Sequence, residues 1–363
     1  MSLILIYIIS LLLIMGLCLF VIHLCGLLPF STLIDYLFRH KKGVNPSNKT
    51  TILNLDLNKL HEKDKQYGNW LVHPCVRYIP EGFANHKWWL VVTPYPNHNS
   101  KYEQPVLFYG DGEDVAPPKK WIYVDIVQNA HENGFNSDPN LFYDAGKLWI
   151  FWKETGTENT NGTPKSHSIM ARYFDGVRFG TIQKMAVNID ENKANVFAPV
   201  VLKIKDKIIM LATAFEHERV LDKQMPYGHN HLAIWNLNHH ILDNASFVYD
   251  RTVIQDYPES FNFWHTDMCN VDDRIYLSVV SNEIANELLI GLSRDGFNYR
   301  YSEQPLLSSR SNNMDSLYKA SIVVVEKKVF VFHPMRLGII KKNRKSPICV
   351  TEYDLEYLLN ILK

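Results

Sequence analysis

The chain has 363 residues, and its 38 Lys and Arg residues are balanced by 38 Asp and Glu residues. This balance excludes a broad basic face, so we expect no nucleic-acid partner, because binding to a phosphate backbone needs clustered cations. The length suits one large all-β domain or two domains of ordinary size.

The chain opens on an apolar segment. Residues 3–30 contain no Asp, Glu, Lys or Arg, and the run is long enough to cross a bilayer as a helix. It lacks the basic start and small-residue cleavage site of a signal peptide. We therefore expect an uncleaved transmembrane anchor over residues 1–30, with a cleavable signal peptide as the alternative.

Cations follow this span but do not precede it. Arg39, Lys41 and Lys42 come directly after it, which predicts a single-pass protein with its large domain in the cytoplasm. A translocated domain is the alternative. Outside the span the cysteines are odd in number and lack CxxC spacing, so we predict neither a disulfide framework nor a structural zinc site.

A polar stretch separates the span from the rest of the chain. Residues 31–69 include Pro46 and several Asn and Lys residues, which predicts a juxtamembrane linker. From Trp70 onward the sequence alternates as strands do, with period-2 patterns such as KLWIFW and RIYLSV.

One short pattern recurs along this region. A polar residue, often followed by Pro, opens an apolar strand, a tight charged turn follows, and a second strand carries more aromatic residues. The copies begin at His73, Asp138, Ala198, His265 and Lys319. Their near-regular spacing predicts the blades of a propeller rather than a helical array.

Asp-Gly pairs lie between these hairpins. They occur at Asp111, Asp175 and Asp295 within β-type sequence and supply the positive φ of a tight turn between outer strands. We therefore predict an all-β fold, a five-bladed β-propeller over residues 70–340 with four-stranded antiparallel blades. A C-terminal strand and helix over 341–363 would close the domain, because its leucines can line one helix face.

The segment SDPNLFYDAGKLWIFWKE, which begins at Ser137, resembles the five-bladed propeller glycoside hydrolases of the arabinanase, β-xylosidase and invertase type (families 43, 32 and 68). The five hairpins extend this likeness to about Arg336. The resemblance implies three axial acids: a base or nucleophile in the first blade, an Asp in the second and a Glu acid in the third. Asp138 matches the second, but His73 and Ala198 stand at the other two positions.

The propeller arrangement aims the opening residues of the strands at one axial pocket. Our candidate catalytic residues are Asp138, Asp267 and Glu103, because a carboxylate pair whose pKa values are separated can run acid–base chemistry. The candidate substrate-binding residues are His73, Glu154, His265, Lys319, Trp264 and Arg336. Strand-end caps, solvated strand ends and buried polar pairs are the alternatives for these side chains.

Metal binding is a separate alternative. His73, Asp138, His265 and Asp267 are ligand types, but the sequence has no close ligand spacing such as HExxH. We therefore expect no cofactor, and keep a bound divalent ion as the alternative.

These observations lead to one expected function and two alternatives. We expect a membrane-anchored, carbohydrate-active protein that cleaves or transfers a glycosyl unit, with a carbohydrate or polysaccharide as its ligand. The alternatives are a non-catalytic glycan-binding propeller, which the missing carboxylates favour, and a scaffold that binds another protein. Whether the protein is an enzyme stays open at this point, and two carboxyl groups about 5–9 Å apart would favour catalysis.

Overall fold

The computed structural model divides the chain into two compact units, Met1–Lys42 and Gly43–Lys363. Described residues all lie in the second unit: 50–67, 70–96, 99–112, 115–130, 134–156, 167–187, 194–216, 230–253, 255–258, 261, 263–282, 287–309, 317–335 and 346–362. The anchor predicted over residues 1–30 lies outside them. Within the described part, no helix has the length and apolarity needed to cross a membrane.

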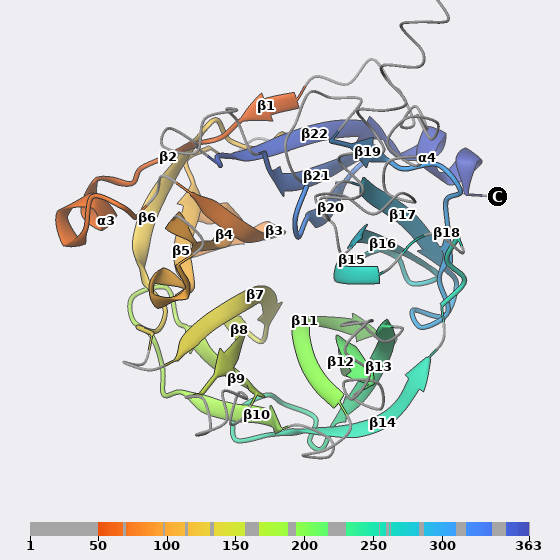
Figure 1. The fold of residues 1–363 in the computed structure, drawn as a ribbon, viewed down its shortest axis with the longest axis horizontal. Helices are drawn as coiled ribbons and strands as arrows, with labels where there is room; N and C mark the ends of the chain where they lie inside the picture. The colour runs from red at the N-terminus through yellow and green to blue at the C-terminus, as the bar shows by residue number, and fades with distance from the viewer. Residues whose placement is uncertain are drawn as a thin grey trace, which may run out of the picture. The chain divides into compact units, whose positions relative to one another are not determined.

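Five antiparallel sheets surround a central axis, as Figure 1 shows. The first blade contains β3 (Leu71–Phe83), β4 (His86–Pro94), β5 (Val106–Gly110) and β6 (Lys120–Ile126). The second contains β7 (Phe135–Asp144), β8 (Lys147–Thr155), β9 (His167–Phe174) and β10 (Gln183–Val187). The third contains β11 (Ala194–Ile204), β12 (Lys207–Glu216), β13 (Asn230–Leu237) and β14 (Phe247–Val253).

The last two blades follow the same plan. The fourth contains β15 (Phe263–Asp272), β16 (Ile275–Asn282), β17 (Glu287–Ser293) and β18 (Arg300–Tyr301), with β19 (Leu307–Ser308) also pairing with β17. The fifth contains β20 (Ser321–Val325), β21 (Lys328–Pro334), β22 (Ile348–Asp354) and β1 (Thr50–Ile52). The predicted five-bladed propeller is therefore confirmed.

The N-terminal strand closes the ring. β1 pairs with β22, the third strand of blade five, and Thr50 lies opposite Thr351 with their hydroxyl oxygens 3.0 Å apart. Next along the chain, β2 (Asn54–Leu55) adds a parallel strand to β6 at the outer edge of blade one, and helix α3 (Asn58–Lys63) follows. The propeller thus takes in part of the segment 31–69 that the sequence predicts as a linker.

Apolar side chains fill the gaps between neighbouring blades. Five clusters of buried residues each join two adjacent blades. Trp88 of blade one, for example, packs edge-on against Phe330 of blade five with ring centroids 6.0 Å apart. Burying such a side chain contributes about 1.5–3 kcal/mol, so the aromatic second strands of the repeats hold the blades together.

The C-terminal helix and two of the three predicted Asp-Gly turns are in place, because Gly176 and Gly296 have positive φ values of 100° and 83°. The prediction is wrong for Asp111-Gly112, since Gly112 has no positive φ and the pair begins a longer connection from β5 to β6. The Asp-Gly pairs at 111, 175 and 295 connect the third and fourth strands of their blades. Asp295 Oδ1 accepts hydrogen bonds from the N–H groups of Phe297 and Asn298, each at 2.8 Å. Helix α4 (Leu355–Ile361) packs the buried Leu358 on the cluster between blades four and five.

Three of the inner strands share an unusual bend. His73, Asp138 and Ala198 each precede a Pro and each adopt a left-handed backbone, with φ values of 53°, 55° and 52°. The strand register shifts at each of these positions. A left-handed backbone at a non-glycine residue costs about 1–2 kcal/mol. The rest of the fold therefore stabilises a backbone conformation that these three residues disfavour on their own.

Candidate functional site

The bends bring three side chains together at the axis. His73 Nε2 lies 3.3 Å from Asp138 Oδ1, and His265 Nδ1 lies 3.5 Å from the same oxygen. The residues come from β3, β7 and β15, and each is at most 4% exposed. Figure 1 shows these strands innermost in their blades. We call His73, Asp138 and His265 the axial triad.

Burial favours the neutral form of both imidazoles in the axial triad. Burial lowers the pKa of His73 to about 4, although Asp138 partly opposes the change. Burial likewise lowers the pKa of His265 well below its ordinary value. A neutral imidazole has a lone pair to offer, which is the form that binds a metal ion.

Asp138 is ionised. Burial would raise the pKa of its carboxyl group, but His73, His265, Lys153 and Lys319 together hold that pKa well below its usual range. Lys153 Nζ lies 3.7 Å from Asp138 Oδ2, and the Ser137 hydroxyl donates to the same oxygen at 3.2 Å. The carboxylate thus keeps its charge inside the protein.

The axial triad fits a divalent cation. One ligand atom from each residue lies within 4.8 Å of the other two. Asp138 Oδ1 is buried and accepts no hydrogen bond from the described residues, although both imidazoles approach it. Two imidazoles and a carboxylate are the donor set of many open metal sites, and a cation would satisfy all three groups together.

Glu103 lies near the axial triad as a protonated acid. It follows the short 3-10 helix η2 (Ser100–Tyr102) and is 6% exposed. Burial, followed by the charge of Asp138, raises the pKa of Glu103 to about 8. Two neighbouring carboxyl groups are therefore held in opposite states, one ionised and one protonated.

Aromatic side chains enclose the imidazoles. The ring of Tyr318 has its centroid 5.1 Å from that of His73 and 4.9 Å from that of His265. Trp264 lies edge-on to His265 at 5.7 Å, and its carbonyl oxygen accepts a hydrogen bond from the Thr213 hydroxyl. These contacts leave the rings little room to rotate.

Lys319 and Asp267 lie beside the axial triad in different roles. The Lys319 ammonium is fully buried and donates a 3.0 Å hydrogen bond to the carbonyl oxygen of Pro139. Asp267 forms a two-pronged ion pair with Arg77, at 3.0 and 2.8 Å. Its carboxylate also accepts from the Ser321 hydroxyl and the Ile322 N–H group, so its lone pairs are committed to the protein.

Two further sequence candidates remain, Glu154 and Arg336. Glu154 follows Lys153 in β8, and alternation along a strand directs the two side chains to opposite faces. Arg336 lies outside the described residues.

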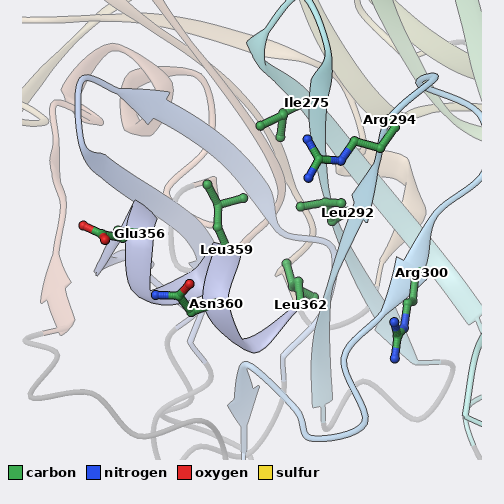
Figure 2. Close-up of a pocket in the computed structure, with 8 residues that line it drawn as sticks. All are labelled: Ile275, Leu292, Arg294, Arg300, Glu356, Leu359, Asn360 and Leu362. Atoms are coloured by element: carbon green, nitrogen blue, oxygen red, sulfur yellow. The ribbon is translucent and has the colours of Figure 1, made fainter.

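A hollow lies on the outside of the propeller, away from the axial triad. It is a cleft of about 420 Å³ between blade four and α4. Its lining residues are Ile275, Leu292, Arg294, Arg300, Glu356, Leu359, Asn360 and Leu362. Figure 2 shows Leu359 of α4, and Leu362 just beyond the end of the helix, on the side nearest Leu292 of blade four. No residue of the inner strands lines this cleft.

Sequence reasoning missed Arg77, Lys153 and Tyr318. Tyr318 directly precedes the candidate Lys319, and Arg77 lies four residues after His73 in the same strand. A search along each inner strand for further polar residues, beyond its opening residue, would have found Arg77. Lys153 gives no such signal, because it lies near the end of a second strand and next to another charged residue, Glu154.

No known protein family matches the sequence, and no curated protein matches it either. Solved structures do match. An N-acetylgalactosamine deacetylase from F. plautii has a TM-score of 0.64 at 15% identity, over 82% of this chain and 94% of that chain. A family 117 glycoside hydrolase from Zobellia galactanivorans has a TM-score of 0.54 at 12% identity, over 85% and 90% of the two chains.

A β-xylosidase has a TM-score of 0.52 at 13% identity, over 79% of this chain and 92% of that chain. At these identities the likeness concerns the fold. The expected resemblance in architecture is confirmed: the chain folds as the five-bladed propeller that carbohydrate-active enzymes also use.

Proposed function

We propose that the protein is a carbohydrate-active hydrolase whose axial triad binds a divalent cation. The observation that carries this proposal is the cluster of three ligand atoms within 4.8 Å of one another. It is supported by the buried Asp138 oxygen that accepts no hydrogen bond from the described residues. We therefore propose a bound divalent ion, the alternative that the sequence leaves open, over a site without a cofactor.

Each residue of the site has a defined task in this proposal. A bound divalent cation would supply Lewis acidity and an activated water. His73 and His265 offer neutral nitrogen ligands, and Asp138 offers an anionic oxygen. Glu103 holds a proton that it can exchange with the reacting oxygen or nitrogen, because its pKa of about 8 is close to working pH. Tyr318 excludes water from the imidazoles.

The proposed reaction is removal of an acyl group from a sugar. The structural neighbour from F. plautii is an N-acetylgalactosamine deacetylase, which supports an N-acetylated sugar as the substrate class. The enclosure of Asp138 supports the same choice. A glycosidase nucleophile must reach a sugar carbon, whereas Asp138 is 2% exposed and lies between two imidazoles.

Cleavage of a glycosidic bond is the second candidate. It is favoured by the opposite protonation states of Glu103 and Asp138, since retaining and inverting glycosidases pair a protonated acid with an ionised carboxylate. In this reading Asp138 acts as the base or nucleophile, and the imidazoles bind hydroxyl groups.

Two assays separate the candidates. The full-length protein is treated with EDTA, reloaded with Zn²⁺, and incubated with N-acetylated sugars and with aryl glycosides. We expect acetate release that EDTA abolishes and Zn²⁺ restores. We expect no such activity in Asp138→Asn, while the surface variant Asp243→Asn, which breaks an exposed ion pair with Lys147, stays active.

Other outcomes point elsewhere. Release of free sugar that resists EDTA would establish the glycosidase instead. Binding of a glycan without turnover of either substrate class would establish a non-catalytic glycan-binding propeller.

We also propose that residues 1–30 anchor the protein in a membrane with the propeller in the cytoplasm. The support is the uncharged run and the cations that follow it. Full-length protein should stay in the membrane pellet after an alkaline carbonate wash, and a chain that begins at residue 43 should not. Recovery of both in the supernatant would exclude an anchor.

A further inference from the structure

A second group of polar side chains lies next to the axial triad, on the same strands. Arg77 follows His73 in β3, Asn140 follows Asp138 in β7, and Asp267 follows His265 in β15. Ser321 opens β20, two residues after Lys319. We call Arg77, Asn140, Asp267 and Ser321 the axial clamp. Each of the three strands that carry a triad residue therefore also carries one clamp residue, and β20 carries the fourth.

Asp267 is the centre of the axial clamp. Arg77 donates to both of its carboxylate oxygens, at 3.0 and 2.8 Å, which joins blade one to blade four. Ser321 donates to Asp267 Oδ2 at 2.5 Å and joins blade five, while Asn140 Nδ2 approaches Oδ1 at 3.4 Å from blade two. A planar guanidinium paired with a carboxylate fixes distance and orientation together.

Further hydrogen bonds extend the clamp to all five blades. The Ser321 hydroxyl accepts from the N–H group of Val76 at 2.9 Å, which ties blade five to blade one. The Asn140 amide oxygen accepts from the N–H group of Val201 at 3.0 Å, which ties blade two to blade three. The inner strands are thus locked in register directly beside the residues that form the axial triad.

We propose that the axial clamp positions the axial triad, and that Asp267 and Arg77 are positioning residues rather than catalytic ones. The backbone at His73 and Asp138 has a left-handed φ, which the chain does not favour on its own. Small shifts between blades would separate the three ligand atoms, because they come from three different sheets. The clamp prevents such shifts. The expected effect on cation binding rests on the proposed function, whereas the expected change in the distances between the triad atoms does not.

The test uses a pair of substitutions that removes the ion pair without changing the net charge. In Arg77→Gln/Asp267→Asn, the new amide oxygen at 267 can still accept from Ser321 and Ile322. Each single variant leaves one buried charge without its partner, so both should lower the Tm more than the double variant does. The matched control is Lys328→Gln/Glu352→Gln, which removes an exposed ion pair of blade five.

The readouts are the Zn²⁺ dissociation constant by calorimetry and the crystal structure of the double variant, both on the full-length protein. We expect Zn²⁺ to bind about 10–100-fold more weakly to the double variant. A loss of this size is usual when residues that orient metal ligands are removed. The control should bind as the wild type does. In the crystal structure of the double variant, the ligand atoms of the axial triad should lie more than 4.8 Å apart.

Two results would overturn the inference: a double variant that binds Zn²⁺ as tightly as the wild type, or an axial triad unchanged in its crystal structure. Failure of the wild type to bind Zn²⁺ would instead sink the proposed function. In that case the role of the clamp is tested by the crystal structures alone, by comparing the distances between the triad ligand atoms in the wild type and in the double variant.

Discussion

Mild acid should destabilise the propeller through its buried histidines, and His333 isolates the effect. This imidazole is fully buried in β21, with Nε2 lying 3.1 Å from the Thr351 hydroxyl. Burial lowers the pKa of His333 from 6.5 to about 4. The unfolded chain therefore binds more protons than the folded one below pH 6.5, so stability is present above that pH and is lost as the pH falls toward 4.

The size of the loss follows from the two pKa values. One pKa unit corresponds to about 1.4 kcal/mol, so His333 removes about 2 kcal/mol of stability between pH 7 and pH 5 and about 3.4 kcal/mol at its acid limit. His73, whose pKa is also lowered to about 4, contributes a similar amount. Together these two residues remove a large part of the roughly 5–15 kcal/mol that stabilises a typical domain.

Urea unfolding at pH 5, 6 and 7, with EDTA present, measures this effect. His333→Gln keeps an amide that can contact Thr351 but does not titrate. The variant should be less stable than the wild type at pH 7, and this deficit should shrink by about 2 kcal/mol at pH 5. Parallel stability curves for the two proteins would refute the argument, because they would show that His333 is not held neutral by the fold.

Three further predictions concern the acid, the closing strand and the packing of blade four. Glu103→Gln should lower kcat by about 10²–10⁴-fold. We expect kcat/KM of the wild type to fall as the pH rises through about 8 and this fall to be absent in the variant; a Gln variant with an unchanged pH profile would remove Glu103 from the chemistry. Deleting residues 1–57 removes β1 and exposes the edge of β22, so this chain should have a lower Tm and aggregate more in light scattering than a chain that begins at residue 43; equal behaviour of the two would show that β1 is dispensable. Gly291→Ala would place a methyl group 2.6 Å from the ring of Tyr301 and should cost about 1–3 kcal/mol in urea unfolding; a variant as stable as the wild type would show that the ring can move aside.

Local signals were enough to predict the propeller. Each hairpin carries its own strand alternation and its own turn residues, and the aromatic second strands supply the packing between blades. The closing strand β1 was not predictable in this way. Its sequence, Thr-Thr-Ile, has no distinctive pattern, and it pairs with Ile348–Asp354 at the other end of the chain. Pairing at that separation is decided by the closed ring and not by neighbouring residues.

The candidate site, like the fold, could be predicted only in part. The opening residues His73, Asp138 and His265 were found because a propeller must bring its first strands to the axis. What could not be predicted is which acids are free to react. Asp267 and Glu103 look alike in sequence, but an arginine from another blade occupies the first, and burial keeps a proton on the second.

Ring closure by β1 has a consequence for synthesis. The ribosome makes this strand long before its partner, because β1 ends at Ile52 and β22 begins only at Ile348. The ring therefore cannot close until all five blades have been made, even though each blade consists largely of consecutive hairpins that can fold as they appear. Until then, the backbone groups of β1 have no partner strand. Docking of β1 onto β22 is thus the step that completes the propeller.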